Sequence, residues 1–261
     1  MCGIFCVVKK RGKINSYKCK KTLSRLNHRG PDWNFYKIFD EKIFMGQTVL
    51  SMTGNKKKKI ENHMSSSRNS LLLYNGEIYN YKHINNAHLK EKLEGIYSDT
   101  KVFVNLIEEK QNKNFYEYLD GMYAFVFYNK NKNKLIIGRD PQGEKIIYFY
   151  EDRNEIIFSS EINSIAYYLE NFEINYGVLS SYFLTRHFSL IDKTTFKNIQ
   201  ILKPGYEIEL NLKNLNIKLK ERINLSELID ENEHVRLNRI SIKDLVKYLD
   251  YLLNKNIKEM I

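Results

Sequence analysis

Short apolar runs separated by polar turns make up the first two thirds of the chain. Residues 3–8 and 71–74 are almost wholly apolar, which is typical of buried strands. The same pattern predicts further strands at 35–39, 44–50, 123–128, 135–138, 146–150 and 156–158, and a hairpin from 207–210 and 216–219. The chain is therefore rich in strands.

Helical spacing occurs between and after these strands, at 18–27, 81–93, 100–110, 162–169 and 176–185. Within the third of these segments, Val102, Phe103, Leu106 and Ile107 form one apolar face. Strands with helices between and after them indicate a layered domain of mixed α and β structure.

The pattern changes after about residue 220. Residues 241–253 carry apolar side chains at 242, 245, 246, 249, 252 and 253, the spacing of an amphipathic helix. Such a helix buries its stripe either on the preceding domain or on a partner. We predict one domain over residues 1–210, followed by a linker and this helix over 211–261.

Composition narrows the function classes. Of 261 residues, 43% are hydrophobic and 13% aromatic, enough for a sizeable globular core. The net charge of +11 invites a nucleic-acid interpretation, but apart from residues 56–59 the lysines are scattered, which favours a solvated basic surface. Three cysteines, no signal segment and no membrane-spanning run predict a cytoplasmic protein without nucleic-acid or membrane partners.

The second residue, Cys2, is the first candidate for chemistry. Removal of Met1 would leave Cys2 with a free α-amine, whose ordinary pKa of about 7.7–8.0 suits a general base for its own thiol. The neighbouring Gly3 leaves room for a ligand. The alternative is that Cys2, like Cys6 and Cys19, is an ordinary small residue of a strand or core.

Two polar segments bear on this choice. Asn75 and Gly76 follow the run 71–74, and a side-chain amide beside a glycine N–H at the end of a strand suits an oxyanion hole. Asn-Gly is also a common hairpin turn. Asp99, at the predicted start of a helix, either caps that helix or binds a substrate ammonium.

Seven motifs in order resemble the class II glutamine amidotransferase domain of the glutamine-hydrolysing asparagine synthetase family. They are MCGIF at 1–5, HRGPDW at 28–33, NGEIYN at 75–80, SDT at 98–100, DGMYAFVFYN at 120–129, GRDPQGEK at 138–145 and SSEI at 159–162. The resemblance covers about residues 1–210. It implies an α+β N-terminal-nucleophile hydrolase fold, a four-layer αββα arrangement with two facing antiparallel sheets, here followed by a helical tail.

The resemblance also implies a reaction, in which L-glutamine and water give glutamate and ammonia. Cys2 would attack the side-chain amide, and water would hydrolyse the resulting thioester. Asn75 and the Gly76 backbone would stabilise the oxyanion. Glu77 and Asp99 match positions that hold the amino-acid head group of the substrate. The ammonia would amidate aspartate or a similar carboxylate.

One departure from the family pattern affects the substrate. Residues 46–52 read GQTVLSM where the family reads about GHRRLSI. The family arginine that binds the glutamine α-carboxylate aligns with Val49, whereas Leu50 and Ser51 keep their backbone contacts. A charge-assisted hydrogen bond contributes about 1.5–3 kcal/mol, so its loss would weaken glutamine binding about 10- to 100-fold.

Two interpretations follow from this departure. Either the chain is a glutaminase, weakened or served by another cation such as Arg29 or Arg68, or it is a catalytically weak or silent module that acts as a binding or regulatory partner. The Ser-Gly-Gly-x-Asp-Ser pyrophosphate loop of the family's second domain does not occur in the sequence. We therefore expect no cofactor for this domain, since ATP and Mg²⁺ would be needed only by the absent synthetase domain. The helix at 241–253 would dock that domain or subunit, and a homodimer is possible.

Overall fold

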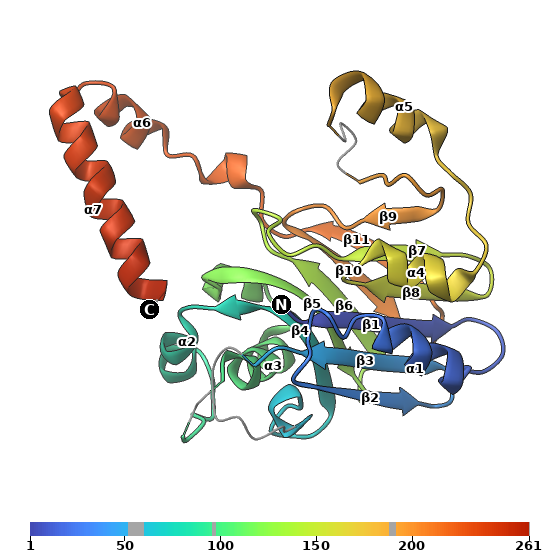
Figure 1. Ribbon diagram of the computed structural model, residues 1–261. Helices are drawn as coiled ribbons and strands as arrows, with labels where there is room; N and C mark the ends of the chain where they lie inside the picture. Colours follow the sequence, from blue (N-terminus) through green and yellow to red (C-terminus); the bar gives the residue numbers. More distant parts are fainter. Residues whose placement is uncertain (52–59, 96–97, 188–191, 261) are drawn as a thin grey trace. The chain divides into compact units, whose positions relative to one another are not determined.

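The computed structural model of the chain describes residues 1–51, 60–95, 98–187 and 192–260 (Figure 1). The basic cluster at 56–59 lies outside the described residues. The chain divides into two compact units, Met1–Arg222 and Ile223–Ile261. The first unit contains two antiparallel sheets with helices beside them, which confirms the predicted α+β fold.

The first sheet has six strands in the order β2-β3-β1-β8-β7-β9. Their bounds are β1 Gly3–Lys9, β2 Trp33–Phe39, β3 Ile43–Val49, β7 Tyr148–Glu151, β8 Glu155–Ser159 and β9 Ile199–Ile201. The second sheet has five strands in the order β11-β10-β6-β5-β4. They are β4 Ser70–Ile78, β5 Gly121–Asn129, β6 Lys134–Arg139, β10 Tyr206–Asn211 and β11 Ile217–Glu221.

Alternation along β1 places a core on each face of the first sheet. Ile4, Cys6 and Val8 belong to a core cluster shared with residues of the second sheet. Phe5 and Val7 face the opposite way, into a cluster with residues of α1 (Ser16–Ser24) and α4 (Ile162–Leu169). The first strand is therefore buried on both faces, as its unbroken apolar run predicted.

The second sheet carries its own helical layer. Phe103 of α3 (Asp99–Lys110) packs edge-on against Tyr74 of β4 and Phe125 of β5. The short helix α2 (Tyr81–Ala87) contacts α3 (Figure 1). The resulting order is helices, sheet, sheet, helices. This is the four-layer arrangement that the resemblance implied.

Several features differ from the sequence prediction, among them β9, which was not predicted. The helix predicted at 81–93 ends at Ala87. The Asn85 side chain accepts a hydrogen bond from Leu93 N–H at 2.9 Å, and such local side-chain bonds compete with helix continuation. The chain also divides after residue 222 rather than 210, because β11 pairs with β10.

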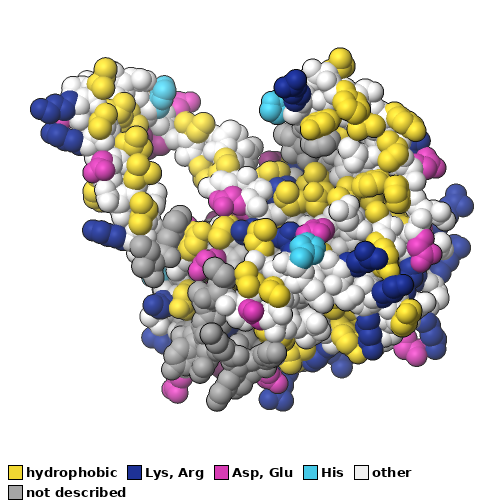
Figure 2. All heavy atoms as spheres, viewed as in Figure 1, with side chains coloured by type: hydrophobic (Ala, Val, Ile, Leu, Met, Phe, Trp, Pro, Cys, Tyr) yellow, Lys and Arg dark blue, Asp and Glu magenta, His cyan; other side chains and the backbone are white. Residues whose placement is uncertain are grey.

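The second unit contains the remaining helices, α6 (Glu231–Leu237) and α7 (Ile242–Met260). The amphipathic helix predicted at 241–253 corresponds to α7, whereas α6 was not predicted. Hydrophobic side chains run along α7 (Figure 2), among them Leu245, Val246 and Leu249, all exposed. None of the helices in the described part of the chain has the length and apolar character needed to cross a bilayer.

A buried histidine makes the fold sensitive to acid. His63, at the end of the 3₁₀ helix η1 (Ile60–His63), packs against Trp33 and Phe35, and its Nδ1 lies 3.0 Å from the Leu72 carbonyl oxygen. Burial lowers the pKa of His63 to about 4. The unfolded chain protonates a histidine near pH 6.5, so the folded state binds fewer protons between these values.

We expect the free energy of unfolding to fall by up to about 3 kcal/mol as the pH drops from about 6.5 to about 4, since only the unfolded state gains this proton. Urea unfolding of wild type and His63→Leu at several pH values measures this. The stability of the variant relative to wild type should improve toward pH 4. The control His83→Leu, at an exposed position, should show no such trend, and a His63→Leu profile parallel to wild type would contradict the prediction.

Candidate active site

The free edge of β4 forms one wall of the candidate site. β4 lies at the edge of its sheet and pairs with β5. Across its free edge, Tyr74 N–H donates to Gln47 Oε1 at 2.9 Å, and Gln47 Nε2 donates to the Tyr74 carbonyl oxygen at 2.7 Å. Farther along, Ile78 N–H donates to Asp99 Oδ2 at 3.1 Å. Two of the outward N–H groups are thus occupied.

Gly76 lies between these two positions. Because backbone direction alternates along a strand, its N–H points to the same free edge as those of Tyr74 and Ile78. No acceptor for it is seen on that edge among the described residues. A side chain would not fit here, since a Cβ on Gly76 would lie 2.1 Å from the Met122 carbonyl oxygen of β5.

The NGEIYN segment was expected to begin where the strand ends, and this was wrong. β4 continues to Ile78, because Gly76 and Ile78 pair with Tyr123 and Gly121 of β5. Gly121 adopts φ +156°, a conformation that favours glycine, where β5 begins. Asn75 and Gly76 are therefore held by a sheet rather than by a turn.

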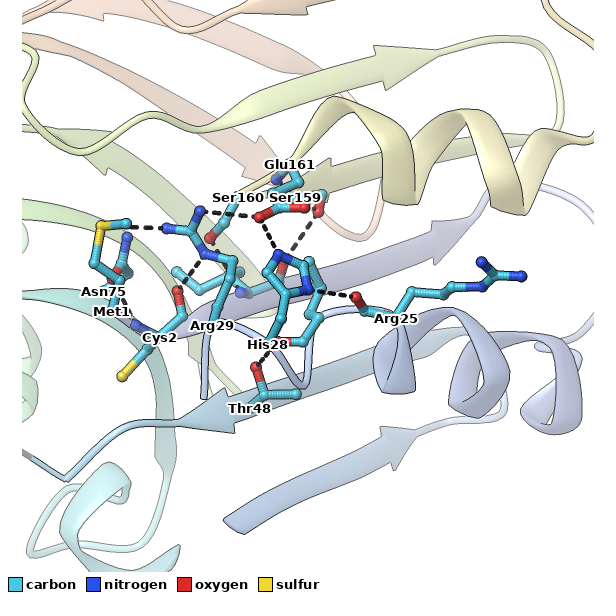
Figure 3. A network of polar contacts seen from close by, with 12 residues as sticks. Met1, Cys2, Arg25, His28, Arg29, Thr48, Asn75, Ser159, Ser160 and Glu161 are labelled. Carbon is cyan, nitrogen blue, oxygen red and sulfur yellow. Dashed lines mark hydrogen bonds and ion pairs between the residues drawn. The ribbon is translucent and has the colours of Figure 1, made fainter. Parts of the chain in front are cut away.

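Cys2 lies directly beside Asn75. The Cys2 backbone N–H donates to Asn75 Oδ1 at 2.9 Å (Figure 3). This bond uses the oxygen of the Asn75 amide. Its Nδ2 is buried and has no hydrogen-bond partner in the described part of the chain. A buried amide donor without a partner is costly, so Nδ2 is a group that an acceptor on a bound molecule could satisfy.

Side chains of two other motifs bind the backbone of the first motif, MCGIF. Arg29 Nε donates to the Cys2 carbonyl oxygen at 3.0 Å, and Arg29 Nη1 pairs with Glu161 Oε1 at 3.1 Å. Ile4 N–H donates to Ser160 Oγ at 3.0 Å. The HRGPDW and SSEI segments therefore fix the start of β1 (Figure 3). Sequence reasoning considered Arg29 only as a substitute cation and missed this role, although the motif contains it.

Val49 lies at the end of β3, and its side chain is 7% exposed within the core between the sheets. Leu50 follows, and its carbonyl oxygen lies 3.8 Å from the Cys2 Sγ. Ser51 N–H donates to Asp32 Oδ2 at 2.7 Å. The structure thus brings the segment 49–51 to the thiol. It places a buried, uncharged valine side chain at the position where the resemblance led us to expect an arginine.

The acidic side of the site is built on α3. Asp99 is 7% exposed, and its carboxylate accepts hydrogen bonds from Tyr74 Oη at 2.8 Å and from the backbone N–H of Ile78 and Thr100. Burial raises the pKa of Asp99, and these hydrogen bonds oppose that rise. Burial and the charge of Asp99 raise the pKa of Glu77. The two carboxyl groups are therefore close enough to interact, and the proposed head-group role of each stays a prediction.

The thiol itself is not pre-ionised. Burial raises the pKa of Cys2, and hydrogen bonding from its surroundings at Leu50 and Gln47 offsets only part of this effect. Cys6 and Cys19 are fully buried, with no exposed surface. The thiol of Cys2 is therefore the accessible one, and it needs a base before it can attack.

A cavity of about 300 Å³ lies on the side of Met1. Its wall includes Arg29, Asn75, Lys145 and Glu161. Figure 3 shows the Cys2 thiol directed away from Met1. Cys2 is not among the residues that line this cavity, so its thiol does not point into it.

Comparisons with known proteins show what the chain is similar to. The family model of the glutamine amidotransferase domain matches residues 1–220. Asparagine synthetase [glutamine-hydrolyzing] 2 of Bacillus subtilis is 31% identical over 225 residues, which cover 81% of this chain and 29% of that protein. Asparagine synthetase B of Escherichia coli is 30% identical over 169 residues, 64% of this chain and 30% of that protein. The chain therefore spans less than a third of the length of these relatives.

Solved structures support the fold. Glutamine phosphoribosylpyrophosphate amidotransferase from B. subtilis aligns with a TM-score of 0.56 and 18% identity, covering 85% of this chain and 49% of that one. An allosteric regulatory enzyme of purine biosynthesis gives 0.58 and 17% with the same coverage. At such identities the likeness concerns the fold alone.

The buried thiol makes a prediction about chemical modification. In the chain that retains Met1, iodoacetamide should alkylate Cys2 slowly at neutral pH, because the pKa of the thiol lies above the ordinary 9.0. The rate should rise about tenfold per pH unit from 7 to 9 without levelling, as the thiolate fraction grows. Mass spectrometry of peptides measures it, with buried Cys6 and Cys19 as internal controls. A plateau near pH 7 would contradict the prediction.

Proposed function

The chain belongs to the glutamine amidotransferase domain family, and on that basis we propose that it hydrolyses L-glutamine to glutamate and ammonia with Cys2 as nucleophile. One observation carries the proposal. The Cys2 backbone N–H donates a hydrogen bond to Asn75 Oδ1 at 2.9 Å. The Nδ2 of the same amide is buried and has no hydrogen-bond partner among the described residues. The Asn75 side chain therefore contacts the proposed nucleophilic residue with its oxygen and offers a hydrogen-bond donor for the oxyanion with its nitrogen.

The first step requires loss of Met1. The freed amine of Cys2 would keep its bond to Asn75 Oδ1 and lie beside its own thiol. It would take the thiol proton as Sγ forms a bond to the side-chain amide carbon of glutamine. The electron pair of the C=O bond moves to oxygen. A base is needed because burial raises the pKa of this thiol.

The oxyanion would be stabilised from β4. Asn75 Nδ2 and the outward N–H of Gly76 are the two donors at this edge. The Cys2 ammonium returns a proton to the departing nitrogen, the C–N bond breaks and ammonia leaves. Water then attacks the thioester, releasing glutamate and restoring the thiol. The sum is glutamine plus water giving glutamate plus ammonia.

The ammonium of the glutamine head group would have charged partners, whereas its α-carboxylate would have none. Asp99 and Glu77 are the carboxylates for the substrate ammonium, and the backbone at Leu50 and Ser51 would meet the α-carboxylate. Val49 supplies no charge there. Arg29 is engaged with the Cys2 carbonyl oxygen and Glu161. We therefore propose that the chain binds glutamine weakly.

Arg68 does not supply the missing cation either. It lies in the turn before β4, which begins at Ser70. Asn75 is five residues farther along that strand, about 16 Å away at the usual rise of a strand. This position argues against Arg68 as a ligand of a glutamine bound at Cys2.

The alternative is a catalytically weak or silent module with a binding or regulatory role, favoured by the uncharged, buried Val49. In either case we propose a cytoplasmic chain that works with a synthetase domain or subunit. An active chain would supply ammonia to that partner, and a silent one would only bind it. That partner would bind ATP and Mg²⁺, amidate aspartate or a similar carboxylate, and dock on α7.

Ammonia release from glutamine by the chain lacking Met1 tests the proposal directly. We expect equal amounts of glutamate and ammonia, lost to background in Cys2→Ala because no other thiol can attack. Cys19→Ala, a change at a buried cysteine on the other face of β1, should keep the activity. Folded, processed protein that releases no ammonia at tens of millimolar glutamine would instead support the silent module.

The missing charge makes a second prediction. Val49→Arg should lower the KM for glutamine about 10- to 100-fold with little change in kcat, since the long side chain can extend out of the core and restore a charge-assisted hydrogen bond to the α-carboxylate. Steady-state kinetics measures it. Val49→Met is the matched control, because it adds length without charge. An equal fall in KM for both variants would show that charge is not the cause.

A further inference from the structure

A single side chain of the first sheet occupies the free edge of β4 next to the oxyanion donors. Gln47 lies in β3 and is 1% exposed. Its amide both donates to and accepts from the backbone of Tyr74, at 2.7 and 2.9 Å. This is the pair of bonds that a neighbouring strand would make. Gln47 therefore acts as a one-residue extension of the second sheet, supplied by the first.

The place of this bond in the chain matters. Tyr74 immediately precedes Asn75, and its N–H is the outward group before that of Gly76. On the other side, Gln47 is opposite Ile4 in the register of β3 and β1, two residues from Cys2. The Gln47 amide thus links the strand that carries the nucleophile to the strand that carries the oxyanion donors by a short path.

The Gln47 side chain also affects the nucleophile. It is among the influences that lower the pKa of the Cys2 thiol. The core between the sheets includes the apolar side chains of Ile4, Met45 and Leu73. Contacts between such side chains are not directional, so they do not by themselves fix one strand along the other.

We propose that Gln47 is a positioning residue for the hydrolysis of the amide, setting the Asn75 and Gly76 donors at the correct distance from the Cys2 sulfur. The inference rests on the proposed function and adds to it a residue that touches neither the substrate nor the reacting bond. In this role Gln47 affects the transition state, where the oxyanion exists, more than the bound glutamine.

Gln47→Met tests the role, because methionine has nearly the same length and no amide. In the chain lacking Met1, kcat for ammonia release should fall about 10- to 100-fold, since small misplacements of catalytic groups have effects of this size. The KM for glutamine should change less than about threefold, because the head-group contacts lie elsewhere. An unchanged kcat, or a rise in KM alone, would overturn the proposal.

Thr22→Val is the matched control. Thr22 is fully buried and donates from Oγ1 to the Lys18 carbonyl oxygen at 2.9 Å within α1, away from Cys2. It removes a buried hydrogen bond from the fold without touching β4. Its kcat should equal that of wild type. A fall in kcat matching that of Gln47→Met would reduce Gln47 to a structural residue and overturn the proposal.

A readout independent of turnover separates this proposal from the proposed function. Iodoacetamide should alkylate Cys2 several-fold more slowly at pH 8 in Gln47→Met than in wild type, because the Gln47 side chain is one of the influences that lower the pKa of the thiol. If wild type releases no ammonia, the proposed function fails and this measurement still decides the role of Gln47. Equal alkylation rates would overturn it.

Gln47→Glu is a second variant, which tests the role of Gln47 if Gln47→Met does not fold. A carboxylate keeps the acceptor for Tyr74 N–H and loses the donor to the Tyr74 carbonyl oxygen, whereas a protonated carboxyl group regains that donor. The alkylation rate and kcat of this variant, each divided by the wild-type value, should therefore rise as the pH falls. A ratio that is constant with pH would count against the proposed role.

Discussion

The outer edge of β4 from Tyr74 to Ile78, which pairs with no strand among the described residues, is the feature on which the site depends. A strand edge presents backbone N–H groups that must find partners, and an exposed edge invites association with other chains. Here Gln47 takes the N–H of Tyr74 and Asp99 takes that of Ile78. The N–H of Gly76 remains between them, beside the unpartnered Nδ2 of Asn75. The N–H groups of Tyr74 and Ile78 already have acceptors, so the Gly76 N–H and Asn75 Nδ2 are the two donors left for a bound molecule.

Burial around Cys2 has two effects that belong together. It raises the pKa of the thiol, so the nucleophile is protonated at neutral pH. The same dry surroundings strengthen hydrogen bonds to an oxyanion. A site of this kind needs a base close to the thiol, and the amine of a processed N-terminus is attached to the same residue. The clamp of Arg29 on the Cys2 carbonyl oxygen keeps that terminus from fraying.

The apolar pattern predicted most of the fold, because a strand that is buried on both faces, such as β1, consists of an unbroken run of apolar residues. It failed where a neighbour decides the outcome. Asn-Gly is a turn dipeptide by local preference, yet Gly76 continues β4 because β5 pairs with it. Asn85 ended α2 through a bond to Leu93 that no periodicity reveals. The resemblance identified the candidate residues, whereas the roles of Arg29 and Gln47 depend on contacts between distant segments.

The replacement at Val49 affects only one end of this arrangement. The proposed nucleophile directly precedes β1, and the proposed oxyanion donors lie on β4. The Cys2–Asn75 hydrogen bond joins the two, and Gln47 of β3 bonds to Tyr74 of β4. The α-carboxylate end depends on the last residues of β3, where the Val49 side chain is directed into the core and the loop beyond is held by Asp32. Under the proposed function, a neutral residue there lowers the attraction for bound glutamine without disturbing the proposed oxyanion donors. Weak binding of the α-carboxylate and loss of catalysis are therefore separate events, and a chain can show the first while it retains the geometry for the second.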